Sequence, residues 1–405
     1  MRPLCTRLTI IDIVADTHID EYQCCSSSPA QALHQRHRSS VSIQTDPTFR
    51  LDGAAPIAGK LSTLDRFLPV WIIAAMALGL LLGTFVPGLN TVLEAVTIGQ
   101  VSLPIAVGLL VMMYPVLAKV RYDQAHRVIG DRKLMITSLV LNWVLAPAFM
   151  FALAWIFIPD LPEYRTGLII VGLARCIAMV MIWNDLACGD REAAAVLVAI
   201  NSVFQVIAFG ALGWFYLQLL PSWLGLPTTS VDFSFWSITA SVLVFLGIPL
   251  MAGFLTRTLG ERARGRDWYE RKFLPQLGPW ALYGLLFTIT LLFALQGGTI
   301  TSRPLDVARI ALPLLVYFVA VFGAGMAVGK WLGLGYARTA TMAFTAAGNN
   351  FELAIAVAIG TFGVTSGQAL AGVVGPLIEV PALVALVYAA LWARTRYFTT
   401  SQPSA

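Results

Sequence analysis

The chain has 405 residues, of which 58% are hydrophobic and only 12% are charged, and its mean hydropathy is +0.75. Soluble proteins average roughly 25% charged residues, so this composition excludes a soluble globular protein and predicts an integral membrane protein with many spans. The net charge of +5 does not indicate a nucleic-acid partner, because the basic residues lie in short loops between apolar runs.

Residues 1–60 differ in composition from the rest of the chain. They hold Cys24, Cys25, His34 and His37, and no apolar run that could span a membrane or act as a signal sequence. We expect residues 1–60 to be a disordered N-terminal extension. A metal site on these cysteines and histidines is the alternative, which their irregular spacing disfavours.

Ten later runs are each long enough to cross a membrane, because a helix of about twenty apolar residues spans the hydrocarbon layer. They are Phe67–Val86, Val101–Ala118, Leu134–Ile158, Thr166–Cys188, Ala193–Leu220, Trp236–Thr256, Trp280–Gln296, Ala308–Trp331, Thr339–Phe362 and Gln368–Ala393. The predicted fold is all-α, with ten transmembrane helices in a transporter domain of residues 61–396 and a short cytoplasmic tail of residues 397–405.

Positive charge alternates between the loops. Between spans 2 and 3 lie Lys119, Arg121, Arg127, Arg132 and Lys133, and between spans 6 and 7 lie Arg257, Arg262, Arg264, Arg266, Arg271 and Lys272. The loop after span 8 is flanked by Lys330 and Arg338, and span 10 is followed by Arg394 and Arg396. The loops at residues 87–100 and 221–235 have neither Lys nor Arg, and the exceptions to the pattern are Arg165, Arg303 and Arg309. The positive-inside rule then predicts cytoplasmic N- and C-termini in the cell membrane.

A weak internal repeat relates the two halves, residues 61–222 and 232–396. An offset of 174 aligns Gly79 with Gly253, Gly189 with Gly363, Ala195 with Ala369, Val206 with Val380, Ala208 with Ala382 and Leu212 with Leu386. It also aligns Cys176 with Asn350 and Gln205 with Glu379. Two repeats of five spans enter the membrane from opposite sides, as in secondary transporters whose substrate site lies near the midplane.

The fourth span carries Gly172, Arg175 and Cys176 in its middle. Glycine beside polar residues at membrane depth predicts a break in the helix, although tight helix packing is the alternative explanation of the glycine. A cysteine is often only a small apolar residue. Here it lies at the predicted break next to an arginine whose charge would favour the thiolate, which is a ligand for soft metals and metalloids.

The ninth span carries Asn349, Asn350 and Glu352 after Gly348, in the same pattern. A lone glutamate within a span is a functional candidate, because lipid does not tolerate a carboxylate without a compensating role. Glu352 is therefore the candidate for proton exchange. Weaker candidates for a functional role, which would line a cavity or hold helices together, are Asn142, Asn184, Asp185, Asn201 and Glu379.

Several enzyme motifs are missing from the sequence. It contains no GxxxxGK[ST] phosphate loop, no HExxH, no GxSxG and no dinucleotide-binding fingerprint. We therefore expect neither an enzyme nor an ATP-driven pump, and no cofactor and no ATPase subunit.

Three stretches of the chain resemble one known family. They are GLARCIAMVMIWNDLACGDREAAAVLVAINSVFQ (172–205), FTAAGNNFELAIAVAIGTFG (344–363) and GVVGPLIEVPALVALVY (372–388). Residues 61–396 are similar to the arsenite efflux permeases of the arsenical-resistance-3 family, within the bile acid/sodium symporter-like superfamily. The resemblance implies ten spans in two inverted repeats. Spans 1, 2, 6 and 7 would form a panel, and the others a core in which spans 4 and 9 break and cross.

The same resemblance implies export of arsenite, and of antimonite in some members, in exchange for protons, which gives arsenic resistance. The family's essential cysteine falls on Cys176 and its glutamate on Glu352. We expect Cys176 to bind the metalloid, with Asn349, Asn350 and Glu352 nearby and Arg175, Asn184 and Glu379 as candidate lining residues. A sodium-coupled organic anion transporter of the same fold is the first alternative, and a membrane receptor without transport is the second.

Overall fold

The computed structural model describes residues 68–86, 88–89, 96–98, 101–120, 131–177, 179–227, 235–302 and 304–398. Apart from Leu68, these residues all belong to one compact unit, Pro69–Ala405. The predicted extension of residues 1–60 lies outside the described residues, as do residues 399–405 of the predicted tail.

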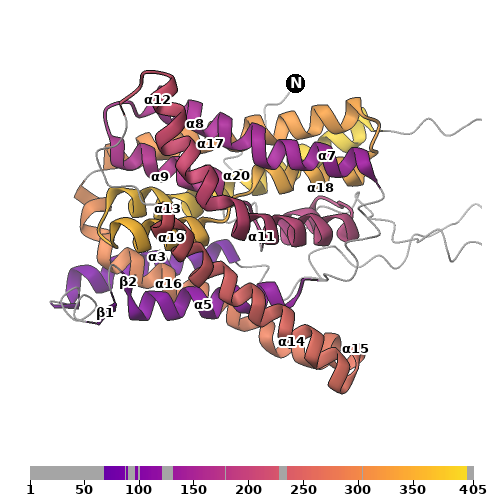
Figure 1. Ribbon diagram of the computed structural model, residues 1–405, viewed down its shortest axis with the longest axis horizontal. Helices are drawn as coiled ribbons and strands as arrows, with labels where there is room; N and C mark the ends of the chain where they lie inside the picture. The colour runs from indigo at the N-terminus through magenta and orange to yellow at the C-terminus, as the bar shows by residue number, and fades with distance from the viewer. Residues whose placement is uncertain are drawn as a thin grey trace, which may run out of the picture. The chain divides into compact units, whose positions relative to one another are not determined.

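The first half of the unit is built almost wholly from helices (Figure 1). They are α3 (Leu68–Phe85), α5 (Leu103–Ala118), α7 (Arg132–Val140), the π-helical turn η3 (Leu141–Leu145), α8 (Ala146–Phe157), α9 (Pro162–Leu173), α10 (Met179–Leu186), α11 (Arg191–Trp214), η4 (Phe215–Leu219) and α12 (Leu220–Trp223). Two-residue strands β1 (Thr97–Ile98) and β2 (Val101–Ser102) form a short antiparallel hairpin before α5. The strands are only two residues long, so the expectation of an all-α fold is confirmed, and the helix of span 2 begins at Leu103 rather than at the predicted Val101.

The second half continues in the same way. Its helices are α13 (Phe235–Val242), η5 (Leu243–Gly247), α14 (Ile248–Arg264), α15 (Arg266–Trp268), η6 (Tyr269–Phe273), α16 (Leu274–Ser302), α17 (Pro304–Trp331), α18 (Tyr336–Ala347), α19 (Phe351–Phe362) and α20 (Gly367–Tyr397).

Each of these four π-helical turns ends two residues before a proline. The prolines are Pro147, Pro221, Pro249 and Pro275. A proline has no N–H to donate, and its ring clashes with the carbonyl group four residues earlier. A wider π-helical turn at that point moves the carbonyl groups apart, so a long helix continues through the proline instead of ending.

The helices pack in two groups. α5 lies against α14 and α16, and the Thr290 hydroxyl of α16 donates a hydrogen bond to the Ala75 carbonyl of α3 (3.3 Å). α17 lies against α8, α18 and α20, and α9 contacts α8, α19 and α20. Figure 1 shows α3, α5, α14 and α16 in its lower part and α7, α8, α17, α18 and α20 in its upper part. We call α3, α5, α13, α14 and α16 the panel group, and α7–α11 and α17–α20 the core group.

Two glycines allow close helix contacts in the panel group, at positions that the offset of 174 relates. A methyl group on Gly79 would overlap the Thr290 carbonyl oxygen, and one on Gly253 would press on the backbone of Leu117 and Ala118. Small residues let backbones approach closely inside a membrane, where packing rather than water drives association. The panel group therefore uses the same device in both halves.

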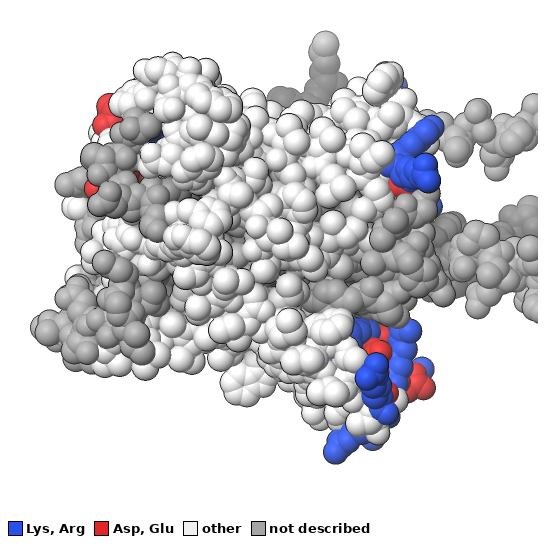
Figure 2. Space-filling model, viewed as in Figure 1, with Lys and Arg blue, Asp and Glu red and all other residues white. Residues whose placement is uncertain are grey.

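By length and composition, six helices in the described part of the chain are able to cross a membrane. They are Arg132–Phe157, Arg191–Trp223, Phe235–Arg264, Arg266–Gly297, Pro304–Trp331 and Gly367–Tyr397, and shorter apolar helices run over Val70–Phe85, Leu103–Ala118 and Phe351–Phe362. The chain is thus a multi-pass membrane protein, and the number of ten spans stays a prediction. On the face shown in Figure 2, Lys and Arg gather at one end of the unit, where α14 and α15 lie.

Candidate substrate site

Two helix breaks meet inside the core group. α9 ends at Leu173 and α18 ends at Ala347, and each is followed by irregular backbone before the next helix begins. The predicted interruptions of spans 4 and 9 are therefore confirmed. Arg175 pairs with Asn349 in an isolated antiparallel bridge, so the two irregular segments lie side by side.

The bridge is closed by two reciprocal hydrogen bonds. The Cys176 N–H donates to the Gly348 carbonyl (3.3 Å), and the Asn350 N–H donates to the Ala174 carbonyl (3.0 Å). Exposed backbone groups at membrane depth must be satisfied within the protein, and here each break satisfies part of the other. We call these two segments, residues 174–177 and 348–350, the crossing.

The offset of 174 residues relates the two sides of the crossing. α9 and α18 start and stop at equivalent positions, since 162 + 174 = 336 and 173 + 174 = 347. The bridged residues are equivalent (175 + 174 = 349), and so are the two N–H donors (176 + 174 = 350) and the two carbonyl acceptors (174 + 174 = 348). The weak repeat in the sequence thus coincides with a repeat of backbone contacts.

We call the two segments of the crossing its arms. In each arm, a side chain from a helix further along the chain accepts a hydrogen bond from a backbone N–H group. The Gln205 Oε1 atom of α11 accepts a hydrogen bond from the Arg175 N–H (2.9 Å). The Glu379 Oε1 atom of α20 accepts one from the Asn349 N–H (3.3 Å). Because 205 + 174 = 379, the two braces are repeat partners that hold equivalent backbone groups, one with an amide and the other with a carboxyl group.

Arg175 is completely buried at the ends of two helices. Its guanidinium donates to the carbonyl groups of Gly172, near the end of α9, and Ala346, near the end of α18 (3.1 Å to the latter), and to the Tyr317 hydroxyl (2.8 Å). The C-terminal end of a helix carries partial negative charge. Two of these bonds are to helix ends, and the role of Arg175 in favouring a thiolate stays a prediction.

Cys176 is 2% exposed and is a thiol rather than half of a disulfide. It packs directly on the other arm, because a methyl group built on Gly348 would lie 3.0 Å from its Cβ and 3.5 Å from its Sγ atom. The glycine therefore permits the close approach of the thiol to the break in span 9.

The helix α19 begins at the crossing with two of the predicted site residues. The Asn350 side chain caps the helix by accepting a hydrogen bond from the Leu353 N–H (3.0 Å). Glu352 lies in the first turn and is partly exposed, so its carboxylate is near the positive end of the α19 dipole. Glu352 and Glu379 are also close enough for their charges to interact.

Several buried donors around the crossing have no hydrogen-bond partner among the described residues. They are the Arg175 Nε, Asn349 Nδ2 and Asn350 Nδ2 atoms. Leaving a buried donor unpaired costs about 1–3 kcal/mol. The crossing thus combines a thiol, two carboxyl groups and donors that are free to bind the oxygens of a small polar molecule.

Asn142 and Asn201 join helices within the first half. The Asn201 Oδ1 atom accepts from Trp143 Nε1 (3.1 Å), and its Nδ2 atom lies 3.4 Å from the Asn142 Oδ1 atom. Asn142 in turn donates to the Ser138 carbonyl (2.8 Å). The Gln205 Nε2 atom donates to the Asn201 carbonyl (3.3 Å), so this network supports the brace that Gln205 provides.

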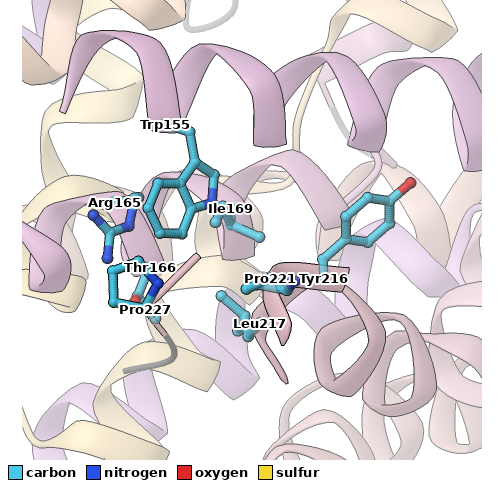
Figure 3. Close-up of a pocket in the computed structure, with 8 residues that line it drawn as sticks. All are labelled: Trp155, Arg165, Thr166, Ile169, Tyr216, Leu217, Pro221 and Pro227. Carbon is cyan, nitrogen blue, oxygen red and sulfur yellow. The ribbon is translucent and has the colours of Figure 1, made fainter. Parts of the chain in front are cut away.

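A small pocket lies away from the crossing and contains none of its residues. It is lined by eight residues (Figure 3), namely Trp155, Arg165, Thr166, Ile169, Tyr216, Leu217, Pro221 and Pro227. It is formed by the end of α8, the start of α9 and the turn that joins η4 to α12.

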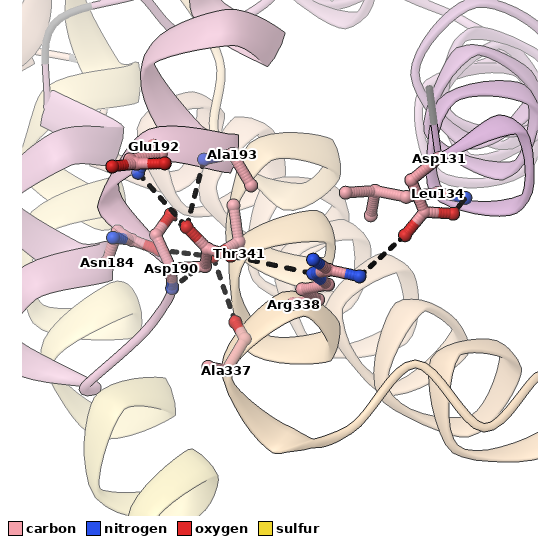
Figure 4. A network of polar contacts seen from close by, with 9 residues as sticks. All are labelled: Asp131, Leu134, Asn184, Asp190, Glu192, Ala193, Ala337, Arg338 and Thr341. Atoms are coloured by element: carbon pink, nitrogen blue, oxygen red, sulfur yellow. Dashed lines mark hydrogen bonds and ion pairs between the residues drawn. The ribbon is translucent and has the colours of Figure 1, made fainter. Parts of the chain in front are cut away.

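Asn184 and Asp185 lie in a different setting from the crossing. The Asn184 Oδ1 atom accepts from the Thr341 hydroxyl (2.6 Å), and Asp185 binds Arg191 (2.5 Å). Figure 4 shows Asn184, Thr341 and Asp190 in one network that also includes Arg338. Their bonds join α10 to the starts of α11 and α18, so the structure does not bring Asn184 together with Cys176.

Arg338 extends this network to α7. Its guanidinium binds Asp131 (2.8 Å) and lies 3.6 Å from Asp190, while Asp190 caps α11 through the Glu192 and Ala193 N–H groups (both 3.0 Å). These contacts hold the starts of α7, α11 and α18 together at one end of the core group (Figure 4).

Sequence reasoning missed Tyr317. This α17 residue is fully buried, and its hydroxyl accepts from Arg175 and donates to the Asn349 Oδ1 atom (3.2 Å). A tyrosine usually lies at the membrane surface with its hydroxyl in water. Its position in the middle of the run LPLLVYFVAVFG was the available signal.

The sequence is similar to that of several known proteins. The family model of the Sodium Bile acid symporter family matches residues 106–303. The chain is 65% identical over 339 residues to the arsenical-resistance protein Acr3 of Corynebacterium glutamicum, covering 84% of this chain and 92% of that protein. It is 32% identical over 333 residues to Acr3 of Alkaliphilus metalliredigens, covering 80% and 91%. It is also 35% identical over 353 residues to an uncharacterized transporter of Synechocystis, covering 82% and 90%.

Proposed function

Because the chain belongs to the Acr3 family of arsenical-resistance proteins, within the superfamily of the bile acid/sodium symporters, we propose that it exports arsenite by proton antiport. It is a transporter and not an enzyme. Antimonite is the second substrate that we propose. The cell membrane, with both termini in the cytoplasm, is the proposed location, and the gathering of Lys and Arg at one end supports that orientation (Figure 2).

The observation that carries the proposal is the thiol of Cys176 among unpaired donors at the crossing. Arsenite near neutral pH is largely uncharged As(OH)3, so charge alone does not select it. A thiolate selects soft metals and metalloids, and the Asn349 and Asn350 amides suit the oxygens of the substrate. No group of three His, Cys, Asp or Glu is clustered within the described residues, so the binding rests on one sulfur atom.

Binding through one thiol is a balanced exchange. The Cys176 sulfur replaces one hydroxyl of As(OH)3, forming an S–As bond, and the thiol proton leaves with that hydroxyl as water. Release is the reverse reaction, in which water returns the hydroxyl to arsenic and the proton to sulfur. A single sulfur holds the metalloid less tightly than three would, which suits a carrier that must release its substrate.

Proton coupling is assigned to Glu352. The carboxyl group lies one helical turn from the bridge, in the first turn of α19, and its charge interacts with that of Glu379. Protonation from the outside would change the charge at the crossing and favour release of the substrate. The protonated carrier, now without substrate, then reorients and releases this proton to the cytoplasm, so that it can bind arsenite again.

Alternating access is proposed to come from rocking of the core group against the panel group, with residues 61–222 and 232–396 as inverted repeats. The equivalent contacts on the two sides of the crossing support that assignment. The groups meet where α13 contacts α19 and where the Gln296 Nε2 atom of α16 donates to the Val364 carbonyl (2.6 Å).

The experiment is arsenite uptake into everted membrane vesicles, with and without a proton-gradient uncoupler, for the wild type and for Cys176→Ala. Uptake that is lost with either the thiol or the gradient is the expected result. The match to the sodium symporter family favours a second candidate, a sodium-coupled organic anion transporter. No arsenite uptake, together with sodium-dependent uptake of an organic anion that does not require Cys176, would establish that candidate instead.

A further inference from the structure

The pocket in Figure 3 contains a cation in unusual surroundings. Arg165 is the only charged residue among the eight that line the pocket, and it is only 4% exposed. It is also one of the exceptions to the distribution of positive charge along the sequence. A buried charge is expensive unless it is paired and hydrogen-bonded.

Within the described part of the chain, the charge of Arg165 is only partly compensated. Its Nη1 atom donates to the Pro159 carbonyl (2.6 Å), and its guanidinium lies 3.7 Å above the centre of the Trp155 ring. A guanidinium has five N–H donors, so this single hydrogen bond leaves most of them for another acceptor.

The nearby acids have other partners. Both carboxylate oxygens of Asp160 bind Arg309. The Glu163 Oε2 atom accepts from the Gly367 N–H (3.1 Å), and Asp306 accepts from the Tyr164 hydroxyl (3.4 Å). None of these three carboxylates forms an ion pair with Arg165 that would neutralise the pocket.

A second hydrogen-bond donor in the wall of the pocket also lacks an acceptor in the described part of the chain. The Trp155 Nε1 atom is buried and has no hydrogen-bond partner among the described residues. Figure 3 shows the Arg165 guanidinium beside the six-membered ring of Trp155, while the indole nitrogen lies at the other edge of the ring, toward Ile169. A buried cation and an unpaired N–H in the wall of one pocket are suited to bind an anion with several oxygens.

We propose that this pocket binds the oxygens of a phosphate group, carried either by a phospholipid head group or by the free ion. The space between its walls, part of which is open to the outside, is about 210 Å³. The neighbouring side chains of Ile156 and Trp223 are 70% and 68% exposed and provide an apolar surface for acyl chains.

Lipid and ion binding to the purified full chain test this assignment. Phosphatidylglycerol binding is measured by native mass spectrometry, and inorganic phosphate binding by the melting temperature in detergent, against chloride at equal ionic strength. The variants are Arg165→Gln and Trp155→Phe, of which the second removes the N–H and keeps an aromatic ring. Arg309→Gln is the matched control, because this arginine lies at the same end of the core group but binds Asp160.

We expect Arg165→Gln and Trp155→Phe each to weaken binding about tenfold, as loss of a hydrogen bond to a charged group does, and Arg309→Gln to leave it unchanged. Loss of the lipid in the two variants, without a phosphate effect on the wild type, identifies a head-group site. A rise of the wild-type melting temperature with phosphate that both variants lose, without loss of lipid, identifies a site for the free ion. If Arg165→Gln does not fold, Trp155→Phe still decides the matter. Wild-type binding of neither probe, or binding that Trp155→Phe leaves unchanged, would overturn the proposal.

Discussion

The two arms of the crossing share a backbone and differ in their side chains. Equivalent N–H groups are braced by Gln205 in one arm and by Glu379 in the other. Cys176 in the first arm has Asn350 as its repeat partner in the second. The first arm therefore carries the sulfur, whereas the second carries the carboxyl groups and the capping amide.

This difference suggests a division of work within a common scaffold. The reciprocal backbone bonds fix where the arms lie, and neither depends on the identity of a side chain. Side chains are then free to diverge, so that one arm binds the metalloid and the other exchanges protons. Variants that change one arm and spare the other are the way to test this division.

The largest effect is expected from Cys176→Ser. This change removes the soft ligand and leaves the backbone bond from residue 176 to the Gly348 carbonyl in place. Arsenite uptake into everted vesicles should fall to the level of vesicles without the protein, with normal amounts of protein in the membrane. Cys188→Ala, in the turn that follows α10, is the control, and uptake should be nearly unchanged. Substantial uptake by Cys176→Ser would remove the sulfur from the mechanism.

The second arm is tested by Glu352→Gln. The amide keeps the shape of the side chain at the start of α19 but cannot exchange a proton. Arsenite should still bind to the purified protein, while uptake into vesicles should lose its dependence on the proton gradient. An uptake rate that responds to the gradient as in the wild type would assign coupling to another group, for which Glu379, bonded to the Asn349 N–H, is the candidate.

A smaller effect is expected from the brace at Gln205. Gln205→Leu leaves the buried N–H of Arg175 without its acceptor, which costs about 1–3 kcal/mol. Gln205→Glu keeps an acceptor and reproduces the arrangement of Glu379. The melting temperature in detergent should therefore fall further for the leucine variant than for the glutamate variant. Equal melting temperatures for both variants and the wild type would show that the brace contributes nothing.

The smallest effect is expected outside the crossing, at Asp160. Its hydrogen bonds with the Arg309 guanidinium hold the pKa of Asp160 below its ordinary value of 3.8. A lowered pKa in the folded state stabilises the protein above the unfolded value, and this contribution is lost as pH falls below about 3.8 through the lowered folded value. Because the pair is exposed, we expect Asp160→Asn to change melting temperature only slightly at pH 7, and less at pH 2 than at pH 7. A difference from the wild type that is as large at pH 2 would exclude the ion pair as its cause.

Much of the crossing was predictable from the sequence. Glycine beside polar residues within apolar runs locates both breaks, and the offset of 174 pairs Cys176 with Asn350 from residue order alone. These signals are local in the chain, because a helix cannot easily continue through such residues at membrane depth.

The contacts between the arms were not predictable. Arg175 has a long flexible side chain, so its sequence position does not show that it reaches the ends of α9 and α18. Tyr317 is distant in sequence from both arms, and only the packing of α17 places its hydroxyl between them. For the same reason Asn184, which the sequence suggested as a lining residue, belongs to the network with Thr341 instead.

The measurement that tests the central claim most directly is X-ray absorption at the arsenic edge, on arsenite bound to the purified protein. It reports which atoms surround the metalloid, independently of transport. We predict one sulfur neighbour and two oxygen neighbours in the wild type, and oxygen neighbours alone in Cys176→Ser. Arsenic bound only to oxygen in the wild type, or bound to sulfur in the Cys176→Ser variant, would contradict a metalloid site built on this thiol.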